Sequence, residues 1–427
     1  MPSAVRDARE AAEAVFRRES VQILASLIRL CGSFDRAEEA MQEALANALA
    51  SWPERGVPEN PAAWIMTAAH RKLIDAARRE RTRREKQQAV LYEVEACISP
   101  PDFDFDEPAM YCPDDRLRLI FTCCHPALNR EAQVALTLRT LGGLSTPEIA
   151  KAFLLPEATL AQRIVRAKRK IQDARIPYEV PPPNRLQERL ASVQAVIYLI
   201  FNEGYTASTG DGLVRGDLCS EAIRLARVLG DLMPGAPENL GLLTLMLLHD
   251  SRRDARMVNG ALVTLEDQDR SLWDRGAIAE GLTLLERALQ MVRGAGAGPY
   301  VLQAAIAALH SSAPGAEATD WPQIAALYEK LLAVSPSPVI ALNLAVAVAM
   351  AHGYELGLGR IDALARSLGS YYLFHAARAD LLRRLGRWVE AAAAYRRAVG
   401  LAANQVEREF LERRLREVEG GAALRRH

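Results

Sequence analysis

One stretch of the chain has the residue types that read DNA: LSTPEIAKAFLLPEATLAQRIVRAKRKI, residues 144–171. Its apolar spacing predicts two helices joined at LLPEAT, and Pro156 suits the start of the second because its missing N–H would be unpaired there. In a helix-turn-helix, the second helix meets base edges first and phosphates later. The side chains placed for this are Thr159, Gln162, Arg163, Arg166, Lys168 and Arg169. Taken alone, the stretch fits a solvated helical hairpin equally well.

A second concentration of positive charge follows Trp64 in WIMTAAHRKLIDAARRERTRREK, residues 64–86. Helical spacing predicts one buried side, made of Trp64, Ile65, Ala68, Leu73, Ile74 and Ala77. The other side is cationic, with His70, Arg71, Lys72, Arg78, Arg79, Arg81, Arg83, Arg84 and Lys86. An aromatic ring beside such a helix can stack on an unpaired base. The Trp64 ring fits a place in the core just as well.

The helix predicted before it, FDRAEEAMQEALANAL at residues 34–49, is acidic instead. Its carboxylates are Asp35, Glu38, Glu39 and Glu43. Two interpretations stay open. The acids either pair with the basic helix inside the protein, or they form a docking face for a basic surface of a partner protein.

Residue patterns typical of enzymes are missing from the sequence. FTCCHPAL places Cys123, Cys124 and His125 side by side, but adjacent helical residues point about 100° apart and do not easily face one metal. Glu203, Asp274 and Glu280 fit caps and ion pairs better than a ligand pocket. The chain has no Walker A loop, dinucleotide fingerprint, zinc-protease or nucleophile-elbow motif. We therefore expect no catalytic residues, no metal and no cofactor.

The elements that must position these residues are predicted to be helices throughout, since alanine, leucine and arginine dominate. This indicates an all-α protein with two small helical domains and a larger helical C-terminal domain. The predicted boundaries are residues 1–90, an acidic Pro-rich linker at 91–113, a helix-turn-helix domain at 114–175, a Pro-rich linker (IPYEVPPPN) at 176–184, and a C-terminal domain at 185–427. Breaks in that last domain are expected at TASTGDG, MPGAPEN, GAGAGP and SSAPGAEATD.

Bulk composition narrows the class of protein further. The chain has 427 residues, 50% of them hydrophobic and 25% charged, and its formal net charge is zero. Any attraction to nucleic acid must therefore come from local segregation of charge. No apolar run is long enough to span a bilayer, the N-terminus has no signal-peptide core, and the six cysteines form no disulfide framework. We expect a cytoplasmic protein.

The C-terminal part shows weak internal similarity. Tyr328 and Tyr395 occupy matching positions 67 residues apart, about twice the 34-residue tetratricopeptide period, and Gly353 and Gly386 lie 33 residues apart. The shared phase of glycine and tyrosine favours tetratricopeptide-like hairpins at about 320–415 over a generic alanine-rich bundle.

The order of these features resembles a known family. An acidic helix with AEEAMQEA, a Pro-rich loop, a tryptophan, the basic helix LIDAARRERTRR, an acidic linker and a basic helix-turn-helix are typical of the extracytoplasmic-function (ECF) sigma factors of bacterial RNA polymerase. Residues 10–86 resemble sigma region 2 and residues 114–175 resemble sigma region 4. FNEGYTASTGDGLVRGDLCSEAIRLARVLG and the rest of the extension resemble the subgroup with a tetratricopeptide-containing C-terminal domain.

The resemblance implies partners and contact residues. Region 2 would bind the β′ clamp helices of core RNA polymerase through Glu38, Glu39, Gln42 and Glu43. It would engage the melted −10 element through Asn60, Trp64, His70, Arg71, Lys72, Asp75, Arg78 and Arg79. Region 4, which in the family meets the β flap, would read the −35 element through Thr159, Gln162, Arg163, Arg166, Lys168 and Arg169. The acidic linker would follow the RNA exit path, although a plain spacer explains it as well.

The resemblance therefore implies an alternative sigma factor that brings core polymerase to promoters and helps to open them. The Pro-rich linker directly after the second basic helix suggests that the C-terminal domain regulates the sigma domains. The rival interpretation is a stand-alone helix-turn-helix regulator, or a tetratricopeptide adaptor, that never joins polymerase.

Overall fold

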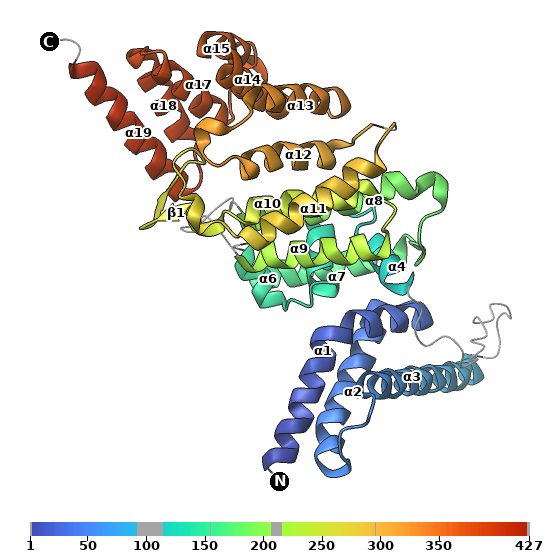
Figure 1. Ribbon diagram of the computed structural model, residues 1–427. Helices are drawn as coiled ribbons and strands as arrows, with labels where there is room; N and C mark the ends of the chain where they lie inside the picture. Colours follow the sequence, from blue (N-terminus) through green and yellow to red (C-terminus); the bar gives the residue numbers. More distant parts are fainter. Residues whose placement is uncertain (1, 92–113, 154, 206–215, 295, 425–427) are drawn as a thin grey trace. The chain divides into compact units, whose positions relative to one another are not determined.

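The computed structural model describes residues 2–91, 114–153, 155–205, 216–294 and 296–424, and these are almost entirely α-helical (Figure 1). The all-α prediction is confirmed. The predicted linker at 91–113 lies outside the described residues except for Leu91, as does the break TASTGDG. The chain divides into two compact units. The first holds residues 1–151 and 155–196, and the second holds residues 152–154 and 197–427.

The first unit carries both predicted DNA-contacting helices. Its elements are α1 (Pro2–Cys31), α2 (Phe34–Arg55), α3 (Pro61–Leu91), α4 (Asp114–Cys123), α5 (Arg130–Thr140), α6 (Thr146–Ala152), α7 (Glu157–Asp173) and the first part of α8 (Pro183–Tyr205). Helices α1, α2 and α3 pack on one another, and α7 packs on α5.

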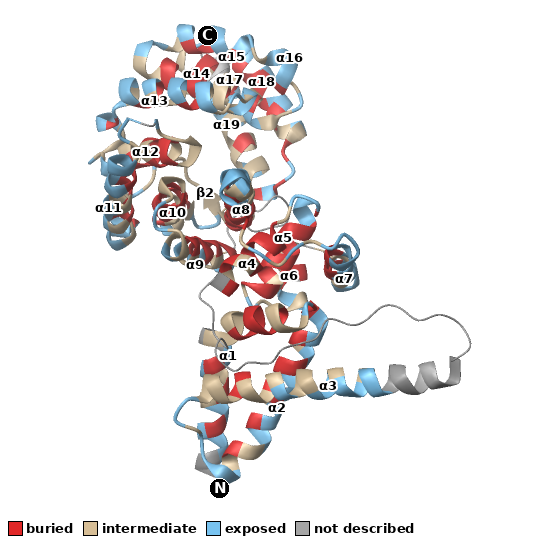
Figure 2. Ribbon diagram, turned by 90° about the vertical axis from the view of Figure 1, so that its right-hand side faces the viewer, coloured by how far each residue is buried: buried red, intermediate tan, exposed pale blue. Residues whose placement is uncertain are grey.

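Helix α2 shows how local sequence sets these elements. The Ser33 hydroxyl caps its start by accepting a hydrogen bond from the Arg36 N–H at 3.4 Å, and Gly56 ends it with φ +83°. One stripe is buried at helical spacing: Phe34, Ala37, Ala40, Met41, Ala44, Ala48 and Trp52. Figure 2 shows buried residues along α2, and along α3 a change from buried and intermediate residues to exposed ones. Because this stripe is made of apolar residues alone, the acidic residues of α2 fall outside it.

The predicted Pro-rich linker at 176–184 is packed rather than free. The Tyr178 hydroxyl donates to the carbonyl oxygens of Ala25 at 2.9 Å and Asp115 at 3.2 Å, and Pro181 is buried. Beyond it, the Arg189 guanidinium donates to the Phe121 carbonyl at 2.6 Å. The structure differs from the predicted spacer because an aromatic hydroxyl in this segment finds buried backbone acceptors.

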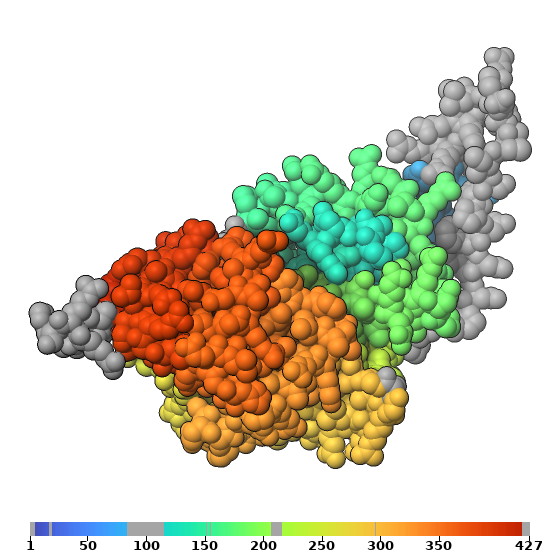
Figure 3. All heavy atoms as spheres, turned by 90° about the horizontal axis from the view of Figure 1, so that it is seen from above, coloured from blue at the N-terminus to red at the C-terminus, as the bar shows by residue number. Residues whose placement is uncertain are grey.

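The second unit is built from consecutive helices. These are the end of α8, α9 (Gly216–Leu232), α10 (Pro237–Asp250), α11 (Arg275–Met291), α12 (Pro299–Ser312), α13 (Trp321–Val334), α14 (Pro338–His352), α15 (Tyr354–Asp362), α16 (Ala365–Leu368), α17 (Tyr372–Arg384), α18 (Trp388–Leu401) and α19 (Gln405–Leu424), with short 3-10 turns at Arg253–Ala255, Arg270–Leu272 and Ala316–Ala318. The breaks predicted at MPGAPEN, GAGAGP and SSAPGAEATD all separate helices. In Figure 3 the helices coloured orange to red close into one continuous surface on the face drawn.

Two glycines with matching roles end helices in the last part of the chain. Gly353 (φ +113°) separates α14 from α15, and Gly386 (φ +74°) separates α17 from α18. Only glycine adopts these angles without strain. Tyr395 is buried between the paired helices, and burial raises its pKa to about 12, as it does for Tyr328. Helical hairpins are thus present, while their assignment as tetratricopeptide repeats stays a prediction.

One small sheet was not predicted. β1 (Met257–Val258) pairs antiparallel with β2 (Ala261–Leu262), and Asn259 and Gly260 both have positive φ in the turn. Asn-Gly between short strands is the usual signal for such a hairpin, and MVNGAL carries it.

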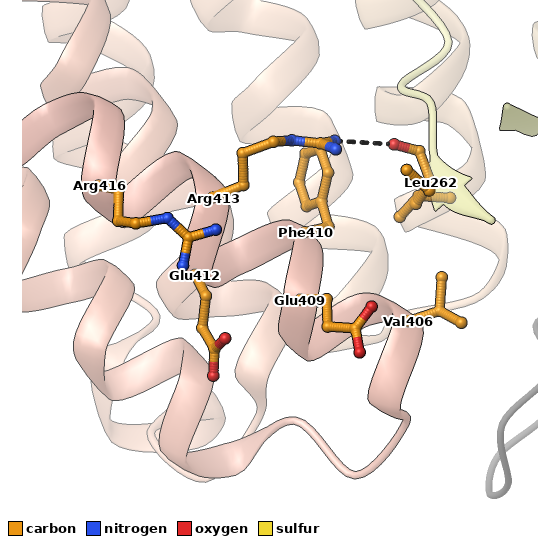
Figure 4. A pocket seen from close by; sticks show the side chains of 8 residues that line it. Leu262, Val406, Glu409, Phe410, Glu412, Arg413 and Arg416 are labelled. Carbon is orange, nitrogen blue, oxygen red and sulfur yellow. Dashed lines mark hydrogen bonds between the residues drawn. The ribbon is translucent and has the colours of Figure 1, made fainter. Parts of the chain in front are cut away.

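A pocket of about 320 Å³ lies where α19 passes β2 (Figure 4). Arg413 donates from its guanidinium to the Leu262 carbonyl oxygen at 3.0 Å and lies 5.4 Å from the Phe410 ring centroid. These contacts tie the C-terminal helix to the hairpin. No helix in the described parts of either unit is long and apolar enough to cross a membrane.

Candidate nucleic-acid and polymerase interface

The acidic residues of α2 lie on the side opposite its buried stripe. Glu39, Gln42 and Glu43 are exposed, whereas the Glu38 side chain keeps only 18% of its surface accessible. Glu38, Gln42, Leu45 and Leu49 follow at spacings of four, three and four, so they share one face of the helix. Leu45 and Leu49 line a groove of about 540 Å³ together with Arg9, Ala12, Glu13 and Phe16 of α1. The polar row therefore continues into an exposed apolar groove.

The basic helix α3 begins at a capped turn. The Asn60 side chain accepts a hydrogen bond from the Ala63 N–H at 3.0 Å, so this predicted DNA contact also acts as a helix cap. Ile65, Met66 and Ala69 form the fully buried side. The predicted core positions Trp64, Ala68, Leu73, Ile74 and Ala77 are only partly buried. The buried stripe is therefore narrower than predicted and is shifted by one residue.

The Trp64 ring meets the core without being enclosed by it. Its centroid lies 5.5 Å from that of Trp52, edge to face, and Trp52 is 2% exposed. Trp64 itself remains partly accessible. Both interpretations of Trp64 therefore stay open. The ring packs on the core, and part of it remains accessible for stacking on an unpaired base.

The charged residues of α3 differ in their availability. Arg71, Asp75, Arg78 and Arg79 are exposed. Lys72 instead forms an ion pair with Glu43 of α2 at 2.9 Å. Burial lowers the pKa of His70, so its imidazole is neutral near neutral pH and adds no charge to the face. The side chains of Arg83, Arg84 and Lys86 lie outside the described residues.

The helix-turn-helix forms as predicted in α6 and α7. At the start of α6, the Ser145 N–H donates to the Glu148 carboxylate at 2.7 Å, and the Ser145 hydroxyl donates to the same group at 2.6 Å. These bonds make a capping box and lower the pKa of Glu148. Ile149 and Ala150 on α6, and Leu160 and Ile164 on α7, are buried. Pro156 stands directly before the first turn of α7.

The predicted base-contacting residues of α7 fall into two groups. Thr159, Gln162, Arg166 and Arg169 are exposed. Arg163 is 25% exposed and pairs with Glu131 of α5 at 2.8 Å. This pair positions the Arg163 guanidinium beside the exposed residues of α7.

Lys168 does not belong to the exposed row. It is 9% exposed, and its Nζ lies 2.9 Å from the Asp35 carboxylate and 2.8 Å from the Glu38 carboxylate, both on α2. In this arrangement Lys168 cannot face a DNA phosphate. Its position four residues after Ile164 and three before Ile171, both buried, is a sequence signal that places it on the buried side of α7.

The adjacent cysteines are structural. Cys123 and Cys124 are 0% and 1% exposed, and burial raises the pKa of both thiols, that of Cys124 to about 11. The Cys124 sulfur lies 3.5 Å from the Thr137 hydroxyl. Within the described parts of the chain, no group of three or more histidine, cysteine or carboxylate side chains is arranged to hold a metal. Buried neutral thiols of this kind are packing residues.

The carboxylates predicted as caps and ion pairs serve those roles where they can be traced. Asp274 caps α11 by accepting a hydrogen bond from the Ala277 N–H at 3.0 Å. Glu280 forms a bidentate pair with Arg227 of α9.

Sequence reasoning missed one cluster of buried cations in the second unit. Arg252 and Arg256 are 9% and 8% exposed, and both turn toward Tyr205 at the end of α8. Arg252 donates to the Tyr205 hydroxyl at 3.2 Å, and the Arg256 guanidinium lies 3.7 Å above the ring. The signal was the charge run HDSRRDAR directly after the apolar helix LGLLTLMLL.

Comparisons with known proteins agree with this geometry. Family models for sigma-70 region 2 and sigma-70 region 4 match residues 15–83 and 118–171, and a model described as a family of unknown function (DUF6596) matches residues 189–289. An uncharacterised protein of Rhizobium meliloti (strain 1021) is 44% identical over 400 residues, which is 92% of each chain. The probable ECF RNA polymerase sigma factor SigI of Mycobacterium tuberculosis is 26% identical over 184 residues, covering 43% of this chain and 61% of that protein.

The matches to sigma-70 regions 2 and 4, together with the helix-turn-helix of α6 and α7, thus define a helix-turn-helix protein of transcription initiation. The chain belongs to the ECF group of the sigma-70 family of sigma factors, with its region 2 in α1–α3 and its region 4 in α4–α7.

Proposed function

We propose that this sigma factor directs bacterial core RNA polymerase to specific promoters and helps to open the −10 region. Region 2 would dock on the β′ clamp helices through α2 and engage a melted −10 strand through α3. Region 4 would meet the β flap and read the −35 element as duplex through α7. The protein itself would carry out no covalent chemistry.

The observation that carries this proposal is the separation of opposite charges on neighbouring helices of region 2. Glu39, Gln42 and Glu43 are exposed on α2, and Arg71, Arg78 and Arg79 are exposed on α3. A protein that only binds DNA has no use for an exposed acidic row, since phosphates repel it. The apolar groove beside the row supports a protein partner, because exposed apolar patches with polar rims mark protein interfaces.

The α3 surface supports contact with single-stranded DNA. It combines exposed arginines with the partly accessible Trp64 ring, and stacking together with backbone charge is how unpaired strands are held. On α7, Thr159 and Gln162 lie near the helix start and Arg166 follows one turn later. That order suits base edges first and phosphate next in a major groove.

For the C-terminal unit we propose a regulatory role. The motivation is its length and its continuity with region 4, because α8 begins in the first unit and ends in the second. The covalent connection therefore runs through a helix and not through a loose tether. A change in the second unit then has a stiff element through which to act on region 4.

Charge reversal on α2 tests the polymerase proposal. Glu39→Lys removes an exposed acid that has no ion pair among the described residues. We expect it to weaken binding to core polymerase by about tenfold or more, since it places like charges together across the interface. The measurement is co-elution with core polymerase, followed by in vitro transcription with mapped start sites.

Glu54→Lys is the matched control, an exposed acid near the end of α2 and outside the row. It should bind core polymerase normally. If the unmodified chain binds promoter DNA tightly by itself and ignores core polymerase, the protein is a stand-alone regulator and the sigma mechanism is wrong.

A further inference from the structure

Lys168 of α7 links the two sigma regions through an ion triad. Its Nζ lies 2.8 Å from Glu38 and 2.9 Å from Asp35, residues that are 130 and 133 positions away in the sequence. Lys168 is 9% exposed, and the Glu38 side chain is 18% exposed. Asp35 is different, because 74% of its side chain remains accessible.

The triad lies against the core of region 4. Burial raises the pKa of the Cys123 thiol at the end of α4, and the charges of Lys168 and Glu38 also act on it. The Lys168 and Glu38 side chains keep only 10% and 18% of their surface accessible, so the pair is sheltered from water. A sheltered pair is screened less by salt than a surface pair, and removing one partner leaves a charge without compensation.

A second set of contacts joins the same two regions. Asp115 of α4 is 0% exposed, and its carboxylate accepts hydrogen bonds from Ser26 at 3.0 Å and Arg29 at 2.9 Å, both on α1. Tyr178 bridges Ala25 of α1 and Asp115 of α4 through its hydroxyl. Two independent polar networks thus hold region 4 against region 2.

We propose that, in the free protein, region 4 occupies part of the polymerase-docking face of region 2, with Lys168 taking the place of a polymerase cation on Glu38. This inference rests on the proposed docking role of α2. Binding of core polymerase must then break the Lys168–Glu38 pair, so the free chain is held in a state of low affinity for polymerase. The exposed row of α7 with Thr159, Gln162 and Arg166 is left uncovered.

The physical argument is one of competition. Glu38 is already desolvated by its own chain, so a polymerase cation gains only the difference between two ion pairs. A ligand shifts such an equilibrium only by its differential affinity for the two states. Because only open chains can bind, the closed state lowers the apparent affinity of α2 for polymerase in proportion to the fraction of chains that are open.

Zero-length cross-linking tests the contact directly on the full-length protein. A carbodiimide joins an amine to a carboxylate only when the two groups touch. We expect peptide mass spectrometry to recover Lys168 joined to Asp35 or Glu38 in the free chain, and to show this product reduced when core polymerase is present in excess. A free chain without the product, or a yield that polymerase leaves unchanged, would overturn the proposal.

A series of variants tests whether the triad lowers the affinity of the free chain for core polymerase. Lys168→Met keeps the apolar stem and removes the charge. Asp35→Asn weakens the same triad from its exposed side, and Asp35 is not among the residues that the family resemblance assigns to polymerase binding. We expect both to raise the affinity of the full-length chain for core polymerase without DNA, Lys168→Met by about fivefold or more.

Lys170→Met is the control, an exposed lysine two residues away with no ion pair among the described residues, and it should leave the affinity unchanged. Circular dichroism checks that each variant is folded. If Lys168→Met does not fold, Asp35→Asn still tests the proposal. Unchanged affinity in both triad variants contradicts the closed state but leaves the sigma proposal standing. If the unmodified chain does not bind core polymerase, both the closed state and the sigma proposal are wrong.

Discussion

At the scale of single residues, several predicted DNA-contacting cations have partners within the chain. Lys72 pairs with Glu43, Arg163 with Glu131, and Lys168 with two acids of α2. Exposed pairs of this kind contribute little stability, so Lys72 can exchange Glu43 for a phosphate at small cost. Lys168 is sheltered and cannot do so without opening an interface. The ion pairs thus separate residues that are free to bind DNA from one that is not.

His310 of α12 provides a pH-dependent measurement of burial in the second unit. Burial, followed by the charges of Arg252 and Arg270, lowers the pKa of His310 to about 4 from an ordinary 6.5. Below pH 6.5 the unfolded chain therefore binds a proton that the folded chain does not. Stability falls as the pH drops toward about 4, by at most about 3 kcal/mol from this residue.

His310→Gln removes this titrating side chain. The variant should therefore lose less unfolding free energy as the pH falls. We expect the variant to lose about 2 kcal/mol less unfolding free energy than the unmodified protein between about pH 7 and about pH 5. Urea unfolding of both proteins at the two pH values measures this difference. The contributions of carboxylates cancel, because they titrate in both proteins. Parallel losses in the two proteins would show that His310 is not held neutral by the fold.

At the scale of elements, the contact between α10 and α12 depends on a glycine. A Cβ added to Gly241 would lie 2.6 Å from the backbone nitrogen of Val301. The same contact is tied by Glu238, whose carboxylate accepts from the Tyr300 N–H at 2.8 Å and the Val301 N–H at 3.3 Å. An acid placed at a helix N-terminus in this way satisfies donors that have no partner inside their own helix.

Gly241→Ala should therefore destabilise the second unit. The neighbouring atom is backbone and cannot rotate away, so the helices must separate, at a cost of about 1–3 kcal/mol. Gly230→Ala in α9 is the control, because its Cβ would meet nothing within 4 Å. That variant should be neutral or more stable by up to about 1 kcal/mol. Denaturant midpoints measure both, and equal midpoints would contradict the close approach.

At the scale of the whole molecule, a net charge of zero conceals local segregation. Acidic α2 and basic α3 and α7 lie in the first unit, while Arg224, Arg253 and Arg384 of the second unit pair with acids of that unit. A protein of this kind has no long-range attraction to DNA as a body, so its promoter contacts act at short range. This fits a subunit that depends on a larger partner for affinity.

Truncation tests the regulatory proposal at this scale. The chain should be cut after Val196, where the first unit ends, because a cut near residue 182 removes the Arg189 contact with α4. Masking by the second unit predicts more transcript from the truncated chain, and an activating role predicts less. Transcription with core polymerase measures the change, after circular dichroism has shown that the fragment is folded. Activity equal to that of the full chain would contradict regulation.

Most of the fold and part of the site could be predicted from local sequence. Helix formers, capping residues and breaks act within a few residues, so the helical class, the helix-turn-helix and the hairpin glycines Gly353 and Gly386 follow from short windows. The same windows predicted Thr159, Gln162 and Arg166 as available on α7. The Asn-Gly turn was equally local and was missed only because helices were expected everywhere.

What the sequence by itself determined is therefore the set of elements and the sign of charge along each one. Only the tertiary structure decided which charges are available, because ion pairs such as Lys168 with Glu38 or Arg163 with Glu131 join residues whose distance in the chain exceeds any local pattern. It also decided that the segment containing Tyr178 packs, since its buried acceptors come from α1 and α4. The physical reason is that periodicity sets the face of a helix, whereas packing sets what that face meets.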